Sequence, residues 1–117
     1  MAKLIKVWDG TEWQTVGVAA ALPSAFNVVQ SANGTLSAGR NYFVDTTAAR
    51  TLTLPASPSV GDTITIYDAS GSAATNNITI ARNGSKINGQ TDDAIIDVNQ
   101  ASSVFVYTGA AVGWRFD

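Results

Sequence analysis

Three aspartates stand close together in the last third of the chain, at Asp92, Asp93 and Asp97. Two carboxyl groups can act as the acid and the base or nucleophile of glycoside hydrolysis. Carboxylate oxygens also bind Ca²⁺, and Asp62 or Asp68 could supply further ligands. The spacing matches no calcium-binding loop, and aspartate is common in turns for conformational reasons alone. We therefore interpret these carboxylates as solvated turn residues, with cation binding as the alternative.

Two of the commonest residue types of catalytic sites are absent from the sequence. The chain contains no histidine and no cysteine, which removes the commonest general base, the cysteine nucleophile and the thiolate metal ligand. Neither of the two common glycine-rich phosphate-binding motifs occurs, and no motif supports a Ser–Lys pair. We predict a protein that is not an enzyme and that holds no cofactor and no metal ion.

Aromatic side chains offer a different chemistry, which is binding rather than catalysis. The three tryptophans and three tyrosines could form a platform for a sugar ring. Aromatic residues in strands are more often anchors of a core or of a protein interface, however. We assign Phe105 and Phe116 to the core. The residues that we predict at an interface are Leu4, Lys6, Trp8, Trp13, Tyr42 and Tyr67.

The chain carries little charge, with 14% charged residues and a formal net charge of −2. This composition lacks the basic footprint of a nucleic-acid-binding protein. It also presents a weak electrostatic barrier to association, as expected of a surface that neighbouring molecules cover. No apolar stretch reaches the length of about 18 residues that a membrane-spanning helix needs. We therefore expect protein partners, and neither nucleic acid nor a membrane.

Period-two patterns dominate the sequence from residue 40 onward. Leu or Ile alternates with Thr in 51–54, 62–67 and 77–81, which places the aliphatic side chains on one face of each strand. Short strands spaced by about 8–12 residues are typical of a sandwich or barrel. We predict an all-β fold, a small antiparallel β-sandwich or barrel of jelly-roll type. The side chains predicted to be buried are Leu52, Leu54, Ile64, Ile66, Ile78, Ile80, Val104, Val106 and Trp114.

The N-terminal residues suggest a separate element. Asp9-Gly10 stands between two alternating runs, which predicts a tight β-hairpin. Two short strands alone are marginal in water, so the hairpin must pack on its own domain or on a neighbouring chain. We divide the chain into a hairpin or attachment arm at 1–16, a linker with one weak strand at 17–39, and a β-sandwich module at 40–117.

Several segments resemble a recurring β-module of bacteriophage tail fibres and other virion surface proteins, notably those of cyanophages and marine phages. The segments are LPASPSVGDTITI at 54–66, AATNNITIARNGS at 73–85, SVFVY at 103–107, GWR at 113–115 and KLIKVWDGTEW at 3–13. The resemblance implies a β-sandwich-like fold, frequent trimerisation and no enzymatic activity. It implies no catalytic residues.

A single module without shaft repeats or coiled-coil heptads favours one member of this group. We expect a capsid decoration (cement) protein that binds and stabilises the assembled shell as a homotrimer. Its partners would be other copies of itself and the major capsid protein, on the outer surface of the virion. The alternative is a short tail-fibre or host-attachment component that binds a receptor or a host surface glycan. A free carbohydrate-binding module is the third possibility.

Overall fold

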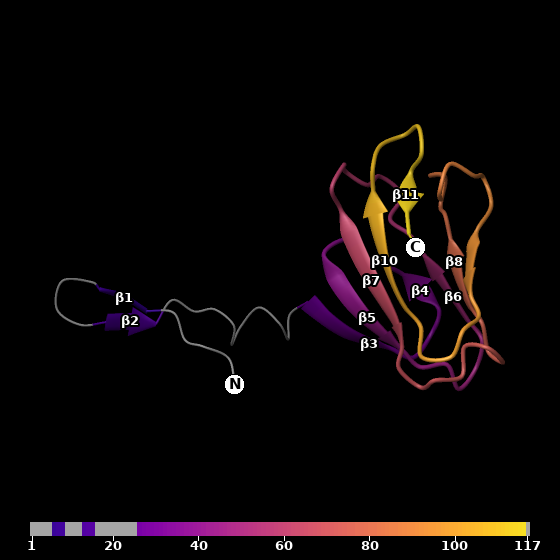
Figure 1. Ribbon diagram of the computed structural model, residues 1–117, viewed down its shortest axis with the longest axis horizontal. Coiled ribbons are helices and arrows are strands. Elements are labelled where there is room, and N and C mark those ends of the chain that lie inside the picture. Colours follow the sequence, from indigo (N-terminus) through magenta and orange to yellow (C-terminus); the bar gives the residue numbers. More distant parts are fainter. Residues whose placement is uncertain (1–5, 9–12, 16–25, 117) are drawn as a thin grey trace.

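Two β-sheets face each other across an apolar core in the computed structural model, which describes residues 6–8, 13–15 and 26–116 (Figure 1). The larger sheet has the strand order β11-β10-β7-β5-β3, and the smaller sheet has the order β4-β6-β8-β9. The strands are β3 (Asn27–Gln30), β4 (Gly34–Thr35), β5 (Arg40–Val44), β6 (Arg50–Thr53), β7 (Thr63–Asp68), β8 (Ile78–Ala81), β9 (Ala94–Ile96), β10 (Ser102–Tyr107) and β11 (Trp114–Arg115).

From β3 to β8 the chain passes from one sheet to the other at every strand. Strands β3, β5 and β7 lie parallel to one another in the larger sheet, and β4, β6 and β8 lie parallel in the smaller one. Each two successive strands, one from each sheet, therefore form one turn of a flattened coil, and these turns stack on one another. The last three strands instead pair antiparallel with their neighbours, β9 with β8, β10 with β7 and β11 with β10.

This topology confirms the prediction of an all-β, two-layered domain and corrects its details. The pairing is mixed rather than antiparallel, and the two sheets do not close into a barrel. Period-two alternation determines which side chains point inward, but it is the same for parallel and antiparallel neighbours. Parallel strands need a crossover connection, and here each crossover contains a strand of the opposite sheet.

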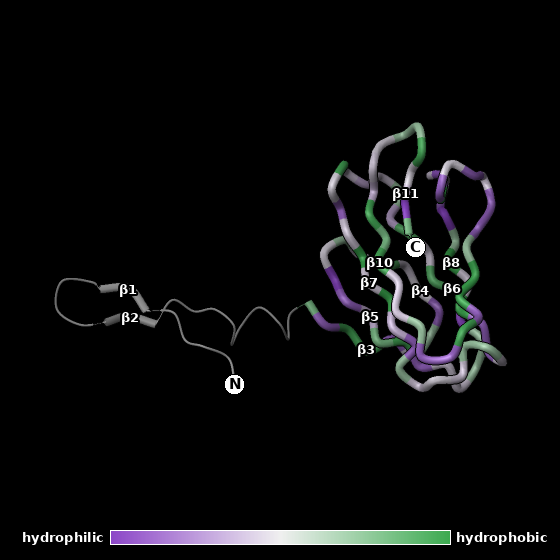
Figure 2. The backbone as a smooth tube through the Cα atoms, viewed as in Figure 1, coloured by the Kyte–Doolittle hydropathy of each residue, from purple (hydrophilic) through white to green (hydrophobic). Residues whose placement is uncertain are grey.

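Aliphatic side chains from both sheets fill the space between them, and Figure 2 shows the corresponding hydrophobic stretches along the strands. The predicted core residues with 0% exposure are Leu52, Leu54, Ile64, Ile66, Ile78, Ile80 and Trp114. Val104 is 50% exposed, so its predicted burial is wrong. Phe105 takes the inward position on β10, and alternation then turns Val104 and the half-buried Val106 outward. Phe116 is half-buried and stacks on Phe105 with ring centroids 4.8 Å apart.

Two further strands precede this domain. β1 (Lys6–Trp8) and β2 (Trp13–Thr15) pair antiparallel with Trp8 opposite Trp13, and they form a two-stranded sheet of their own. Residues 16–25 lie outside the described part of the chain. Strands β3 and β4 fall within the segment 17–39, and each belongs to one of the two packed sheets.

Candidate interaction surface

The larger sheet presents a broad surface to solvent, built from every second residue of four neighbouring strands. The register places Val29, Phe43 and Tyr67 side by side in one row that ends at Ser102. A second row runs parallel to the first. We call these two rows the outer face, and its members are Asn27, Val29, Asn41, Phe43, Thr65, Tyr67, Ser102 and Val104.

Apolar groups occupy the middle of the outer face and one position at each of its two edges. The rings of Phe43 and Tyr67 stack with centroids 5.1 Å apart and planes inclined by 11°, and both side chains are half-exposed. Val29 is 78% exposed and Val104 is 50% exposed. A sheet folds without large apolar side chains on its solvent side, so a continuous group of them is a common sign of a binding surface.

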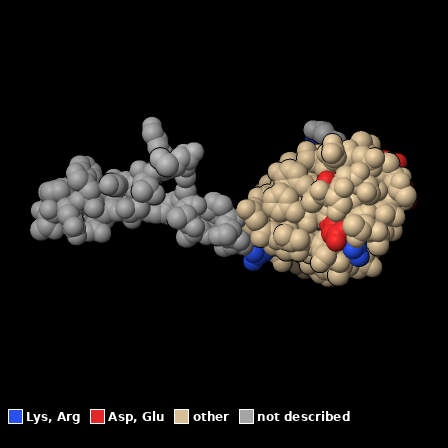
Figure 3. Space-filling model, turned by 90° about the horizontal axis from the view of Figure 1, so that it is seen from below, with Lys and Arg blue, Asp and Glu red and all other residues tan. Residues whose placement is uncertain are grey.

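Amides and hydroxyls complete the outer face. Asn41 Nδ2 donates to Asn27 Oδ1 at 3.0 Å, which fixes both amides in the row beside Thr65. None of the eight side chains is charged. Asp45 and Arg115 lie at its margins, at the ends of β5 and β11. The view of Figure 3 shows that charged atoms are also sparse over another side of the domain. A partner would therefore lose little hydration of charged groups on binding here.

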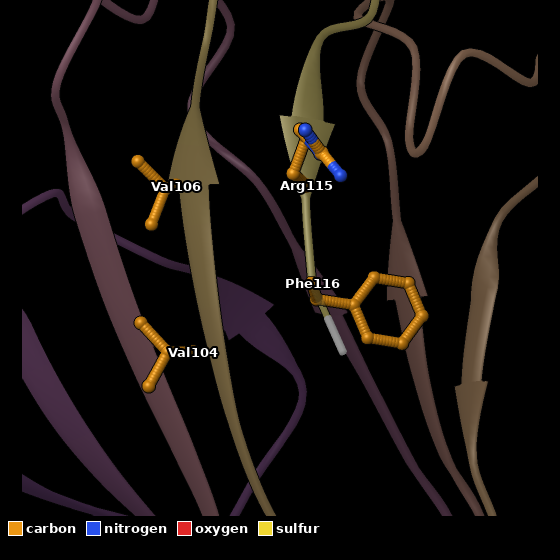
Figure 4. A pocket seen from close by; sticks show the side chains of 4 residues that line it. All are labelled: Val104, Val106, Arg115 and Phe116. Atoms are coloured by element: carbon orange, nitrogen blue, oxygen red, sulfur yellow. The ribbon is translucent and has the colours of Figure 1, made fainter.

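A shallow hollow adjoins the outer face at β10 and β11. Val104, Val106, Arg115 and Phe116 line it, and its volume is about 310 Å³ (Figure 4). The two valines project from β10 on one side, and the ring of Phe116 lies on the other. Two further hollows near β9 also include Phe116 in their lining. All three are open to solvent, unlike the enclosed pockets that bury most of a small ligand.

The six predicted interface residues lie in four different parts of the chain. Tyr67 lies on the outer face. Lys6, Trp8 and Trp13 lie in the strands of the β1–β2 hairpin, for which the structure gives the strand pairing. Leu4 lies outside the described residues.

Tyr42 does not belong to the surface. It is 4% exposed and packs in the core, and its hydroxyl accepts a hydrogen bond of 2.6 Å from the Ser37 N–H. Its neighbour Phe43 is the aromatic residue that faces outward. The sequence contains the signal for this assignment, because Tyr42 and Val44 share a face by period two, and Phe43 does not.

The aspartates of the C-terminal third lie apart from the outer face. Asp92, Asp93 and Asp97 are exposed and flank β9, and the Asp93 carboxylate accepts a hydrogen bond from the Arg82 N–H at 3.0 Å. Asp62 accepts a hydrogen bond from the Ser59 N–H at 2.8 Å, as in an ordinary turn. Across the described residues, no three acidic, histidine or cysteine side chains converge on a possible metal site.

Asp68 is buried at the end of β7 and has a structural environment. Its carboxylate accepts hydrogen bonds from the Thr46 hydroxyl and from the N–H groups of Gly71, Ala73 and Gln100, at 2.5–2.9 Å. Burial alone raises the pKa of Asp68, but these four hydrogen bonds favour the ionised form and bring the pKa below its ordinary value. Through these hydrogen bonds the Asp68 carboxylate holds three loops together at one end of the domain.

Comparison with known proteins gives no family for this chain, since no family model and no curated protein matches it. The described residues also include no helix that is long and apolar enough to cross a membrane. A functional hypothesis therefore rests on the outer face and on the resemblance seen in the sequence.

Proposed function

We propose that the chain is a non-enzymatic structural protein of a bacteriophage virion, and that it acts as a capsid decoration protein on the assembled shell. The resemblance of segments 54–66 and 73–85 to virion β-modules suggests the setting. The observation that carries the binding role is the uncharged outer face, with its stacked Phe43–Tyr67 pair and its exposed Val29 and Val104.

The outer face suits contact with another protein for physical reasons. Removal of apolar surface from water contributes about 25 cal/mol per Å². Aromatic anchors near the centre of a patch supply most of the affinity in many protein interfaces. Phe43 and Tyr67 occupy such a position, with Val29 on one side and Val104 nearby on the other. In this proposal the major capsid protein and other copies of the chain are the partners, and the resemblance implies that trimers are frequent.

Binding to assembled shells tests the proposal. Purified chain is added to shells that lack it, and the bound fraction is measured by co-sedimentation. Phe43→Ser and Tyr67→Ser should each weaken binding by about tenfold or more, the loss typical of an interface anchor. Thr79→Ser, on the outer side of the smaller sheet, is the matched control and should bind like the unmodified chain. Unchanged binding by both aromatic variants would contradict the proposed surface.

The same surface supports a second candidate, a glycan-binding component of a short tail fibre. The half-exposed aromatic pair beside the Asn27–Asn41 amides offers apolar surface next to hydrogen-bonding groups, as a sugar ring requires. Glycan-array binding that is lost in Tyr67→Ala would favour this candidate. The number of copies in a cryo-EM map of the virion separates the two, because a decoration protein covers the shell in far more copies than a tail holds.

A further inference from the structure

The two packed sheets end in four edge strands, and three of these are poorly suited to pair with another strand. An edge strand exposes unpaired N–H and C=O groups, and proteins protect such edges by making them short or by adding charge. β4 has two residues, and so does β11, which includes Arg115. β9 has three residues and is flanked by Asp92–Asp93 and by Asp97.

The fourth edge, β3, has none of these protections. Its four residues, Asn27-Val28-Val29-Gln30, include no charge and no proline, and Val29 is 78% exposed. β3 pairs with β5 on one side, and no described strand pairs with its other side. An unprotected, β-branched edge of this kind is a template for adding a strand from another chain.

Hydrogen bonding shows which groups of β3 point to the side that no described strand occupies. The Asp45 N–H donates to the Gln30 carbonyl at 2.8 Å, so the main-chain groups of Gln30 face β5. The direction of these groups alternates along a strand. The N–H and C=O of Val29 therefore point away from β5, as do those of Asn27.

We propose that this edge of β3, which no described strand occupies, pairs antiparallel with β3 of a second copy of the chain, about a two-fold axis at Val29. The two larger sheets then form one continuous sheet. Val29 of each copy exchanges both main-chain hydrogen bonds with Val29 of the other. Asn27 lies opposite Ser31 of the second copy in this register.

The partner is a second copy because the edge is self-complementary. Two-fold interfaces bring the same patch together from both subunits, and they are the commonest kind in homo-oligomers. Pairing Val29 with itself sets apolar against apolar with no like charges in contact. It also places the two valine side chains on the same side of the joined sheet, so that the rows through Phe43 and Tyr67 run continuously across both copies. The resemblance implies that trimers are frequent, so the mass of the chain in solution decides between a two-fold pair and a trimer.

A single cysteine gives a direct test, since the chain has none of its own. Paired residues of this type have Cα atoms about 5.5 Å apart, within the range of a disulfide. Full-length Val29→Cys should therefore form a covalent dimer under mild oxidation. Ile95→Cys, on the charge-flanked edge β9 and 56% exposed, is the matched control and should cross-link much more slowly. Equal cross-linking of the two variants would overturn the proposal.

The mass of the full-length chain gives a second, independent test by sedimentation equilibrium. The unmodified chain should sediment as a dimer. Val29→Lys sets two lysines directly opposite each other and should raise the dimer dissociation constant by about tenfold or more. Val29→Thr keeps the β-branched shape and should remain dimeric. A monomeric or trimeric unmodified chain, or a Val29→Lys variant as dimeric as the unmodified chain, would overturn the pairing. Such a result would not decide whether the chain is a virion protein, which the shell-binding experiment tests separately.

Discussion

The outer sides of the two sheets share one folding pattern but differ in chemistry. The smaller sheet sets Thr51 beside Thr79 and Ile95, and Thr35 beside Thr53 and Ala81. We call this side the threonine face. The larger sheet places two aromatic rings and two valines in the equivalent positions of its outer face.

This difference shows which part of the sequence the fold requires. Both sheets alternate because their inward side chains must fill one core, and that demand fixes nothing on the solvent side. Threonine fits a pleated strand and its hydroxyl is satisfied by water. Phe43 and Tyr67 fit a strand equally well but leave apolar rings half-exposed. The fold does not require these rings on the outer face, which is why we propose a binding role for them.

The largest expected effect is on the core that both faces share. Ile66→Ala removes a 0% exposed side chain of the larger sheet and should lower the free energy of unfolding by about 2–5 kcal/mol in urea denaturation. Ile80→Ala, on the smaller sheet, should cost a similar amount. Thr65→Ala, next to Ile66 but on the outer face, is the control and should stay within about 0.5 kcal/mol. A small loss for Ile66→Ala would show that the two sheets do not share one core.

The next effect concerns Asp68, whose hydrogen bonds hold loops at one end of both sheets. Asp68→Asn puts an NH₂ group among hydrogen-bond donors in a buried site, and it should cost about 1–3 kcal/mol of unfolding free energy. The exposed Asp97→Asn is the control and should be near neutral. Thermal unfolding at pH 7 measures both. Equal effects would show that the Asp68 interactions contribute nothing measurable.

The same site predicts how stability depends on pH. The pKa of Asp68 is lowered by folding, so its contribution is fully present above the ordinary value of 3.8 and is lost as the pH falls through the folded pKa. Hydrogen bonds from Thr47 are the main reason that the pKa of the more exposed Asp45 is also lowered, and Asp45 acts in the same direction. The loss of stability below pH 3.8 should be smaller in Asp68→Asn than in the unmodified chain. An identical acid profile would contradict this role.

The sequence predicted the inward face of this protein better than its topology or its surface. Strict Ile–Thr and Leu–Thr alternation identified Ile64, Ile66, Ile78 and Ile80 as core residues, because two-sided strands encode burial locally. Alternation carries no information about whether a neighbouring strand is parallel, so the winding of β3–β8 could not be read from it. β3 itself appeared only as a weak strand within a linker, although it forms an edge of the larger sheet.

The candidate site was found only in part. Tyr67 lies on the outer face, whereas Tyr42 is buried and its neighbour Phe43 faces outward, because aromatic residue type alone does not tell which face of the strand a side chain occupies. β10 carries apolar residues on both of its faces, so its sequence alone does not show whether Val104 or Phe105 points into the core. Only its pairing with β7, which sets Phe105 beside the buried Ile64, decides which side faces inward.

An exchange of residues between the two faces should have a moderate effect on stability. The double variant Phe43→Thr, Tyr67→Thr gives the outer face the chemistry of the threonine face. It removes a stacked pair worth about 0.5–1.5 kcal/mol and keeps good strand formers at both positions. We expect a small drop in the free energy of unfolding, with shell binding lost. A drop of several kcal/mol would mean that the aromatic pair serves folding, and the distinction between the two faces would fail.

The smallest effect is expected on the threonine face itself, with Thr79→Val as the sharpest change. Valine has the shape of threonine, so the substitution replaces one half-buried hydroxyl by a methyl group and leaves the strand geometry unchanged. Surface substitutions of this kind stay within about 0.5 kcal/mol in unfolding experiments. Shell binding should also be unchanged, because Thr79 lies on the opposite side of the domain from Phe43 and Tyr67. If Thr79→Val weakened binding as much as Phe43→Ser does, both sides of the domain would contact partners, and the outer face would lose its special role.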